Sequence, residues 1–167
     1  ISLSPPRIVT SSRAPEIFRE ETGKTPGEFT ETLAWIEALS RVHATNGADF
    51  ADRLETAHAM AECLSSLSAA GIEPGLAKEK LSDSPVPCDL SFWETFTRAY
   101  ESYAGILRQW GYEERHGARR QAIRQNTLAC PGPVILSGVI EMPWALREMV
   151  RRFDKQVEIL VFAPPER

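Results

Sequence analysis

The chain has 167 residues, with 19 Lys and Arg against 23 Asp and Glu, a formal net charge of −4, and 43% hydrophobic residues. This length suits one soluble domain that buries roughly 70% of the surface of its unfolded chain, and the composition excludes a disordered or fibrous protein. The acidity gives no overall attraction to nucleic acid or to an anionic membrane, so such a contact has to depend on a local patch.

The cysteines and the hydropathy of the chain indicate the cellular compartment of the protein. Cys63, Cys88 and Cys130 are widely spaced and form no metal-binding motif, which favours three unrelated thiols in a reducing cytoplasm. No apolar run approaches the ~20 residues that span a bilayer, and no signal-peptide pattern opens the chain. We therefore expect a cytoplasmic protein without a membrane partner. The chain starts without Met and in the middle of a strand-like pattern, which predicts an excised fragment of a longer protein.

The first elements are short. β-branched residues after two prolines predict a brief strand at Arg7 to Thr10. A short helix should follow, with Ser12 as its cap, Pro15 near its first turn and Gly23 as its end.

Two long helices come next. TPGE at Thr25 to Glu28 is a capping box that predicts a helix to about Ala44. A second helix should end where Gly71 takes the left-handed cap, and the two should form an antiparallel hairpin. Apolar residues at helical spacing are predicted to be buried: Phe29, Leu33, Ile36 and Leu39 in the first helix, and Phe50, Leu54, Ala57, Met60, Leu64 and Leu67 in the second.

A short helix at Leu76 to Leu81 should lead into a Ser/Pro loop, the most linker-like part of the chain. SFWE at Ser91 to Glu94 is another capping box, and its helix should stop at Gly111. A more polar helix follows and is broken by CPGP. The predicted stripe of the longer helix consists of Phe92, Phe96, Tyr100, Tyr103, Leu107 and Trp110, with Trp93 off the stripe.

The last segment predicts a βαβ unit with a parallel strand pair: Val134 to Ser137, a helix from Pro143 to Phe153, and Val157 to Phe162. The whole is an α/β fold in a single domain, with a strand and short helix at 1–24, a helical block at 25–130 inserted in a small parallel sheet, and the βαβ at 131–167. Because parallel sheets are normally covered on both faces, this sheet should belong to a larger one. Alone, its edge strand is expected to self-associate or to pack back on the helices.

A nucleotide site would need a Gly-rich loop between strand and helix, with a Lys for the phosphates. SGVIEMPW at residues 137–144 has one Gly, no Lys and a Pro, so this turn alone does not predict a phosphate cradle.

The order of these elements resembles that of a known protein family. The order of PPRIVT, long helices, FWETFTRAYESYAGILRQWGY, PVILSGVIEMPWALREMVRRF and VEILVFAPPE is similar to the N-terminal, helicase-like region of AddB-type helicase-nuclease subunits. The resemblance covers nearly the whole chain and implies part of a P-loop-helicase-like domain. It also implies a parent protein that processes double-strand breaks, binds DNA, uses ATP and Mg²⁺, joins a partner subunit and carries a PD-(D/E)XK nuclease domain downstream.

In active helicases of that superfamily the corresponding strand ends in an Asp-Glu pair that serves Mg²⁺ and the attacking water. The matching positions here are Ser137 and Gly138, and the next acid is Glu141, three residues further on. The resemblance therefore implies a degenerate Walker B strand end and no catalytic residue. Glu141 is either a residual nucleotide or DNA contact or an acid that favours the dipole of the next helix.

A basic segment is the other candidate site. With the adjacent Glu113 and Glu114 this segment has a net charge of +2. The spacing puts Arg115, Arg119 and Arg124 roughly on one helix face, which could contact phosphates. A solvated face paired with neighbouring acids is the alternative. A smaller cluster at Arg147, Arg151 and Arg152 has the same two interpretations. The candidate DNA-binding residues are Arg115, Arg119, Arg120 and Arg124.

These patterns predict a non-catalytic, helicase-like segment of a DNA-repair protein, with no metal site and no cofactor of its own. The alternative is a free-standing helical protein interaction module without a nucleic-acid role. A small hydrolase built on the βαβ unit lacks a visible nucleophile and base and ranks last.

Overall fold

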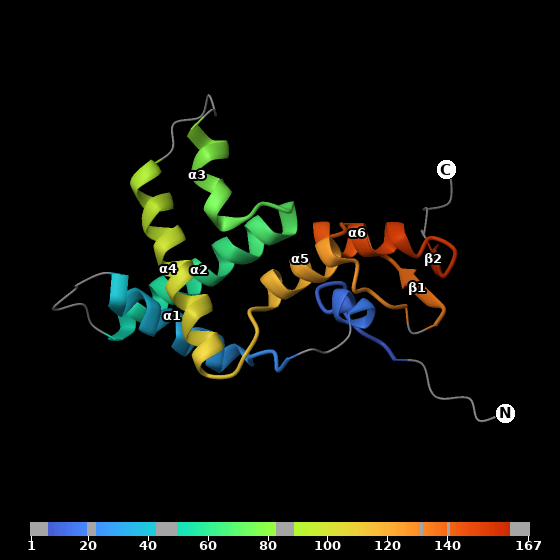
Figure 1. The fold of residues 1–167 in the computed structure, drawn as a ribbon, viewed down its shortest axis with the longest axis horizontal. Helices are drawn as coiled ribbons and strands as arrows, with labels where there is room; N and C mark the ends of the chain where they lie inside the picture. Colours follow the sequence, from blue (N-terminus) through green and yellow to red (C-terminus); the bar gives the residue numbers. More distant parts are fainter. Residues whose placement is uncertain are drawn as a thin grey trace, which may run out of the picture. The chain divides into compact units, whose positions relative to one another are not determined.

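A computed structural model describes residues 7–19, 23–42, 50–82, 89–130, 132–139 and 141–160. This part of the chain is mostly helical and contains a two-stranded parallel sheet, which confirms a mixed α and β fold (Figure 1). The chain divides into two compact units. Unit 1 consists of Ile1–Glu21 and Arg119–Arg167, and unit 2, Thr22–Ala118, is inserted between them in the sequence.

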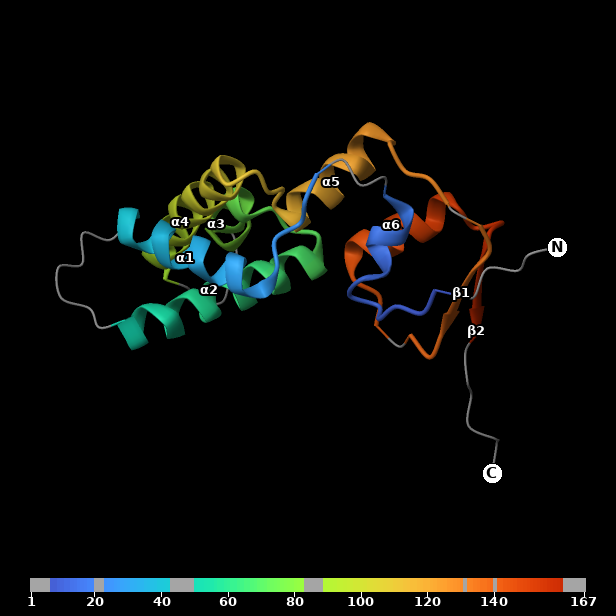
Figure 2. The same ribbon diagram turned by 90° about the horizontal axis from the view of Figure 1, so that it is seen from below.

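Unit 2 is helical. Its elements are α1 (Glu28–Val42), α2 (Phe50–Ala70), α3 (Pro74–Ser82) and α4 (Leu90–Gln109). As predicted, α1 and α2 lie side by side and antiparallel (Figure 2), and α4 packs against both α1 and α3. The predicted ends at Ala44 and in the Ser/Pro loop lie outside the described residues.

Two helix ends in unit 2 confirm the glycine predictions. Gly71 has φ +77° after α2, and the amide of Ile72 donates to the carbonyl of Leu67 at 2.8 Å. Gly111 has φ +80° after α4, and the amide of Tyr112 donates to the carbonyl of Leu107 at 2.8 Å. In both places glycine adopts the left-handed conformation that other residues disfavour, and the chain leaves the helix.

The start of α4 differs from the prediction. Its cap is Asp89, whose Oδ1 accepts hydrogen bonds from the amides of Ser91 and Phe92 at 2.9 and 3.3 Å. Ser91 therefore lies inside the helix, and SFWE is not the capping box. An aspartate two residues earlier supplies a charged acceptor to the same orphan amides. The start of α1 is also later than expected, since its first helical residue is Glu28.

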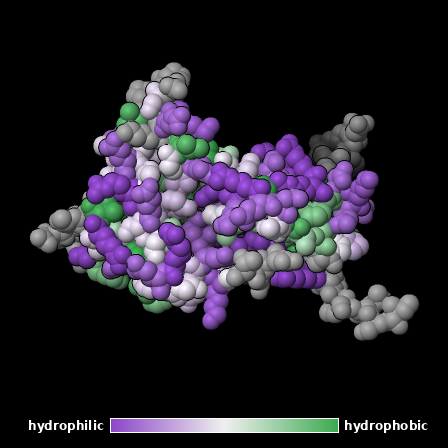
Figure 3. Space-filling view, in the orientation of Figure 1, coloured by the Kyte–Doolittle hydropathy of each residue, from purple (hydrophilic) through white to green (hydrophobic). Residues whose placement is uncertain are grey.

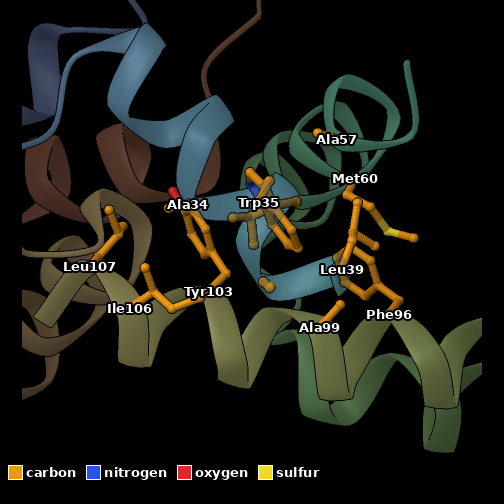
Figure 4. Close-up of a cluster of buried hydrophobic side chains, with 12 residues drawn as sticks. Ala34, Trp35, Leu39, Ala57, Met60, Phe96, Ala99, Tyr103, Ile106 and Leu107 are labelled. Atoms are coloured by element: carbon orange, nitrogen blue, oxygen red, sulfur yellow. The ribbon is translucent and has the colours of Figure 1, made fainter. Parts of the chain in front are cut away.

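The core of unit 2 lies between α1, α2 and α4 (Figure 4). Its centre is Trp35, whose ring stacks on Tyr103 with centroids 4.3 Å apart and lies 6.2 Å from Phe96. Ala34 and Ala38 flank Trp35 and are fully buried, so the backbones of α1 and α4 approach closely there.

Burial corrects part of the predicted stripes. Phe29 is 76% exposed and Phe50 61% exposed, because the alanines and Trp35, rather than Phe29 and Leu33, define the core face of α1. In α4, Phe92 and Trp110 are also exposed, near its two ends. The stripe residues that are buried as predicted are Leu39, Ala57, Met60, Leu64, Phe96, Tyr103 and Leu107.

The first segment of unit 1 corrects two further predictions. Residues 7–10 form no strand, and a 3-10 helix η1 (Ala14–Phe18) follows without a side-chain cap from Ser12. Instead, the amides of Arg13 and Ala14 both donate to the carbonyl of Thr10, at 3.0 and 2.9 Å. A strand needs a hydrogen-bonding neighbour, and here the local turn takes the carbonyl of Thr10.

Helix α5 (Arg115–Gln125) ends before CPGP, the predicted breaker. Asn126 has φ +55°, and the amide of Thr127 donates to the carbonyl of Ala122 at 3.1 Å. Asparagine tolerates the left-handed conformation better than most residues, so it ends the helix four residues before Cys130.

The βαβ unit is present, with β1 (Val134–Ser137), α6 (Trp144–Arg152) and β2 (Val157–Leu160). The strands are parallel, in register from Val134 with Val157 to Ser137 with Leu160. Figure 2 shows α6 and η1 on one side of the strands. The core there includes Phe18, Leu146 and Met149, whereas Ile135 on β1 is 61% exposed. The predicted continuation of the second strand to Phe162 lies outside the described residues.

Candidate nucleic-acid interface

The carboxyl end of β1 carries the residues that the family resemblance marks as a degenerate strand end. Ser137 is its last residue and is exposed, and Gly138 follows with φ +64°, donating its amide to the carbonyl of Leu160 at 3.3 Å. Glu141 is exposed and lies three residues before the first residue of α6. This turn therefore presents a hydroxyl, a glycine and, three residues after the glycine, one carboxylate, which do not form the acid pair that Mg²⁺-dependent hydrolysis requires.

A hollow of about 470 Å³ lies at the opposite, amino end of the strands. Its lining includes Cys130, Val134, Lys155 and Val157. Ligands of open parallel sheets bind outside the carboxyl ends of the strands. The hollow is thus not where the family resemblance would put a nucleotide.

The start of α5 is held by hydrogen bonds within unit 2. The Glu114 carboxylate accepts from the amides of His116 and Gly117 at 2.7 and 2.6 Å, and from the hydroxyl of Tyr100 at 3.0 Å. Arg115, one of the predicted DNA contacts, pairs with Glu31 through Nη2 and Oε1, 3.1 Å apart. Arg115 also donates to the carbonyl of Pro26 at 3.3 Å, so it ties α5 to α1.

Further along α5 the predicted contacts enter unit 1. Arg119 is only 8% exposed, and its Nε donates to Glu16 Oε1 at 2.8 Å while its Nη2 donates to the carbonyl of Ser12 at 2.9 Å. Arg120 is equally buried, and Arg124 is exposed. The structure therefore does not bring the arginines of α5 onto one open face. Two of them pair with glutamates that are distant in the sequence.

The smaller cluster on α6 has a different surrounding. Arg147, Arg151 and Arg152 are all exposed, and Arg151 pairs with Glu148 at 2.9 Å on the same helix. The buried face of α6, with Leu146 and Met149, points to the core of unit 1. In the orientation of Figure 1, hydrophilic side chains cover the region of α6 (Figure 3).

Trp93 and Tyr103 do not offer a stacking surface for bases. Trp93, the aromatic residue off the predicted stripe, is half-buried against the core and contacts Phe96 edge to face at 5.8 Å. Tyr103 is buried, and burial, followed by the nearby charges of Glu31 and Glu114, raises the pKa of its phenol. This tyrosine is therefore a neutral core residue at physiological pH.

Metal and thiol chemistry find little support. Among the residues described, no three His, Cys, Asp or Glu side chains gather closely enough to hold a metal ion. Burial raises the pKa of the half-buried Cys63 thiol, which lowers its reactivity, and Cys130 donates to the carbonyl of Gly132 at 3.0 Å. Cys88 lies outside the described residues. None of the helices described is long and apolar enough to span a membrane.

Sequence reasoning missed the residues that fix α5. Glu16 and Glu31 hold Arg119 and Arg115, yet they lie about a hundred residues away in the chain. Neither glutamate belongs to a motif, so nothing local in the sequence marks it.

Charge is distributed unequally between the units. Unit 1 contains 11 Lys and Arg against 8 Asp and Glu, a net charge of +3, and unit 2 contains 8 against 15, a net charge of −7. The overall value of −4 hides this difference. An acidic ligand would therefore find its complement on unit 1.

Comparison of the chain with models of known protein families, with curated proteins and with solved structures gives no match.

Proposed function

We propose that this chain is a non-catalytic, helicase-like region that contacts DNA, as part of a protein similar to the AddB-type helicase-nuclease subunits that its sequence resembles. The observation that carries the proposal is the charge of unit 1, which is net positive in an acidic chain and has exposed arginines on α6. Nucleic-acid binding depends on such a local basic surface rather than on the charge of the whole protein.

The strand end supports the non-catalytic part of the proposal. Ser137 and Gly138 stand where the helicase resemblance puts an acid pair, and Glu141 is exposed and follows the last residue of the strand by four residues. If the βαβ unit derives from a P-loop helicase, it has therefore kept the backbone arrangement and lost the residues that hydrolyse ATP. We expect calorimetry with Mg-ATP to detect no binding tighter than ~100 μM, a free energy of about −5.5 kcal/mol.

DNA binding is the direct test. Labelled duplex and single-stranded DNA should be titrated with the whole chain at low salt, with fluorescence anisotropy as the readout. We expect weak binding that falls steeply with salt, in the range of ~10⁻⁴ to 10⁻⁶ M that is typical of non-specific contacts near physiological salt. A chain that shows no binding even at low salt would refute the proposal.

One observation favours the alternative, a helical protein interaction module. Unit 2 exposes several large apolar side chains, Phe29, Phe50 and Phe92 among them. Exposed aromatics of this kind are enriched where proteins bind one another. Under this alternative the chain binds no DNA, so the anisotropy titration separates the two functions.

A further inference from the structure

The arginines of α6 differ from those of α5 in what they contact. Arg115 and Arg119 donate to glutamates and to backbone carbonyls inside the fold. Arg147 and Arg152 are exposed, and the Arg151 side chain keeps 67% of its surface accessible even though it pairs with Glu148. All three α6 guanidinium groups are therefore within reach of a ligand in solution, as is Arg124 on α5.

Helix geometry puts Arg147 and Arg151 on the outer surface of α6, whereas Arg152 follows the buried Ala145 by seven residues and is exposed at the end of the helix. Arg147 and Arg151 are four residues apart and so share one face, with a rise of about 6 Å between them. Leu146 and Met149 occupy the opposite face and are fully buried. The helix is thus fixed by its apolar side and presents its basic side outward. Lys155, in the turn after α6, is also exposed.

Four acids lie close to this surface in the sequence, and one of them, Glu141 ahead of α6, is exposed. Glu148 takes Arg151 as its partner, Asp154 accepts from the amide of Lys155 at 2.8 Å, and Glu158 is exposed on β2. An exposed ion pair between residues three apart in a helix contributes only ~0.2–0.5 kcal/mol, so a phosphate can replace Glu148 at little expense.

The position of Arg147 argues against a purely structural role. Basic residues in the last turn of a helix favour its dipole, which accounts for Arg151 and Arg152. Arg147 lies in the first half of α6, where a positive charge gains nothing from the dipole.

We infer that the outer surface of α6, formed by Arg147 and Arg151 and continued by the exposed Arg152 and Lys155 at the end of the helix, is the surface that contacts the phosphates of DNA. This inference rests on the proposed function and names the site for it. Trp144 and Phe153, the aromatics at the two ends of α6, are partly buried against the core of unit 1, so the described part of this surface presents no exposed ring for a base to stack on. The contact is therefore to backbone phosphates and independent of base sequence. A lipid surface does not fit, because the apolar face of α6 is already buried.

The test compares two variants of equal charge in the whole chain. In the first, Arg147, Arg151 and Arg152 are all replaced by Ala. In the matched control, three exposed arginines of unit 2, Arg41, Arg98 and Arg108, are replaced by Ala. Circular dichroism checks that both variants fold. The probe is a labelled duplex of random sequence, titrated at several salt concentrations.

We expect the α6 variant to weaken binding and to lower the slope of log K against log salt by about two to three, since each lost phosphate contact removes ~0.9. The control should keep the slope of the original chain. A third variant with Lys at the three α6 positions should keep most of the slope, because the charge is retained.

Any other outcome refutes either this DNA-binding site or the proposed function. An unchanged slope in the α6 variant, with binding by the original chain, overturns this site and leaves the proposed function standing. Equal losses in both Ala variants show an effect of net charge and overturn the site. Equal displacement of the duplex by DNA and by polyglutamate of the same charge would show a general polyanion surface and would also overturn it. Absence of binding by the original chain refutes the proposed function itself.

Discussion

The two units bury apolar surface in different ways. In unit 2, α1, α2 and α4 enclose Trp35, Phe96 and Tyr103, and each helix satisfies its own backbone hydrogen bonds. In unit 1, α6 and η1 cover one face of two four-residue strands, and Ile135 and Leu160 are exposed on the other. Helices need only a buried stripe, whereas parallel strands need neighbours at both edges and cover on both faces.

The two units also differ in net charge. Unit 2, with its net −7, repels polyanions, and unit 1, with its net +3, attracts them. Under the proposed function, the larger core and the DNA-binding surface therefore lie in different units of the chain. The better-packed part is acidic, and the part with an open sheet face carries the basic surface.

Hydrogen exchange should show the largest difference. We expect amides of Val157–Leu160 to exchange far faster than those in the middle of α4, because two short strands are marginally stable while α4 belongs to the larger core. The experiment needs a verified monomer, since pairing of edge strands between copies would protect β2. Equal protection in a monomer would remove the contrast between the units.

Truncation of the central core residue should have the largest effect on stability. Trp35→Ala is expected to lower the free energy of unfolding by about 3–5 kcal/mol, because it leaves a cavity beneath Tyr103 and Phe96. Urea unfolding followed by circular dichroism measures the change. Phe29→Ala on the same helix is the control, and its 76% exposed ring predicts a change within about 0.5 kcal/mol. Similar losses in both variants would contradict the assigned core face of α1.

The buried ion pair tests what holds α5 in unit 1. Arg119→Ala should lower the free energy of unfolding by about 2–4 kcal/mol, since it removes the donor to the carbonyl of Ser12 and the closer of two arginines at Glu16, where Arg19 Nε lies 3.4 Å away. Arg124→Ala, an exposed position on the same helix, should change it by no more than about 0.5 kcal/mol. In a double-mutant cycle, Glu16→Ala should lose most of its effect once Arg119 is absent. Additive losses would show that the two side chains do not interact.

Two glycines on neighbouring helices should respond in opposite directions to alanine. A Cβ at Gly117 would lie 2.9 Å from Glu114 Oε2, so Gly117→Ala should displace the carboxylate that caps α5 and cost about 1 kcal/mol. A Cβ at Gly105 meets nothing within 4 Å, and Gly105→Ala should stabilise α4 by about 0.5–1 kcal/mol. Chemical denaturation of both variants tests the pair. Stabilisation by Gly117→Ala would contradict the role of Glu114.

The cap of α4 should give the smallest effect, and one that depends on pH. Hydrogen bonds from Ser91 and Phe92 lower the pKa of Asp89 from its ordinary 3.8. A lowered pKa in the folded state means that the cap contributes fully above the ordinary value and loses its contribution as pH falls through the lowered pKa. Asp89→Ala should thus lower the melting temperature slightly at pH 7 and not in strong acid, and Asp89→Asn should keep most of the cap. A difference that persists unchanged in strong acid would contradict this cap.

Local chemistry decided the features that the sequence predicted correctly. Gly71 and Gly111 end helices because only their own backbone conformation is involved, and β1 begins and ends at the predicted residues, Val134 and Ser137. The parallel pairing of β1 with β2 follows from a helix of suitable length between two apolar runs.

The sequence did not determine which face of a helix is buried or where a charge goes. Phe29 has the pattern of a core residue and is exposed, because the alanines beside Trp35 let α4 approach on another side. Arg119 has the pattern of a surface residue and is buried, because Glu16, more than a hundred residues away, supplies its partner. Helix ends and strand limits depend on neighbours in the chain, and periodicity reports them. Burial and ion pairing depend on neighbours in space, so only the tertiary structure decided them.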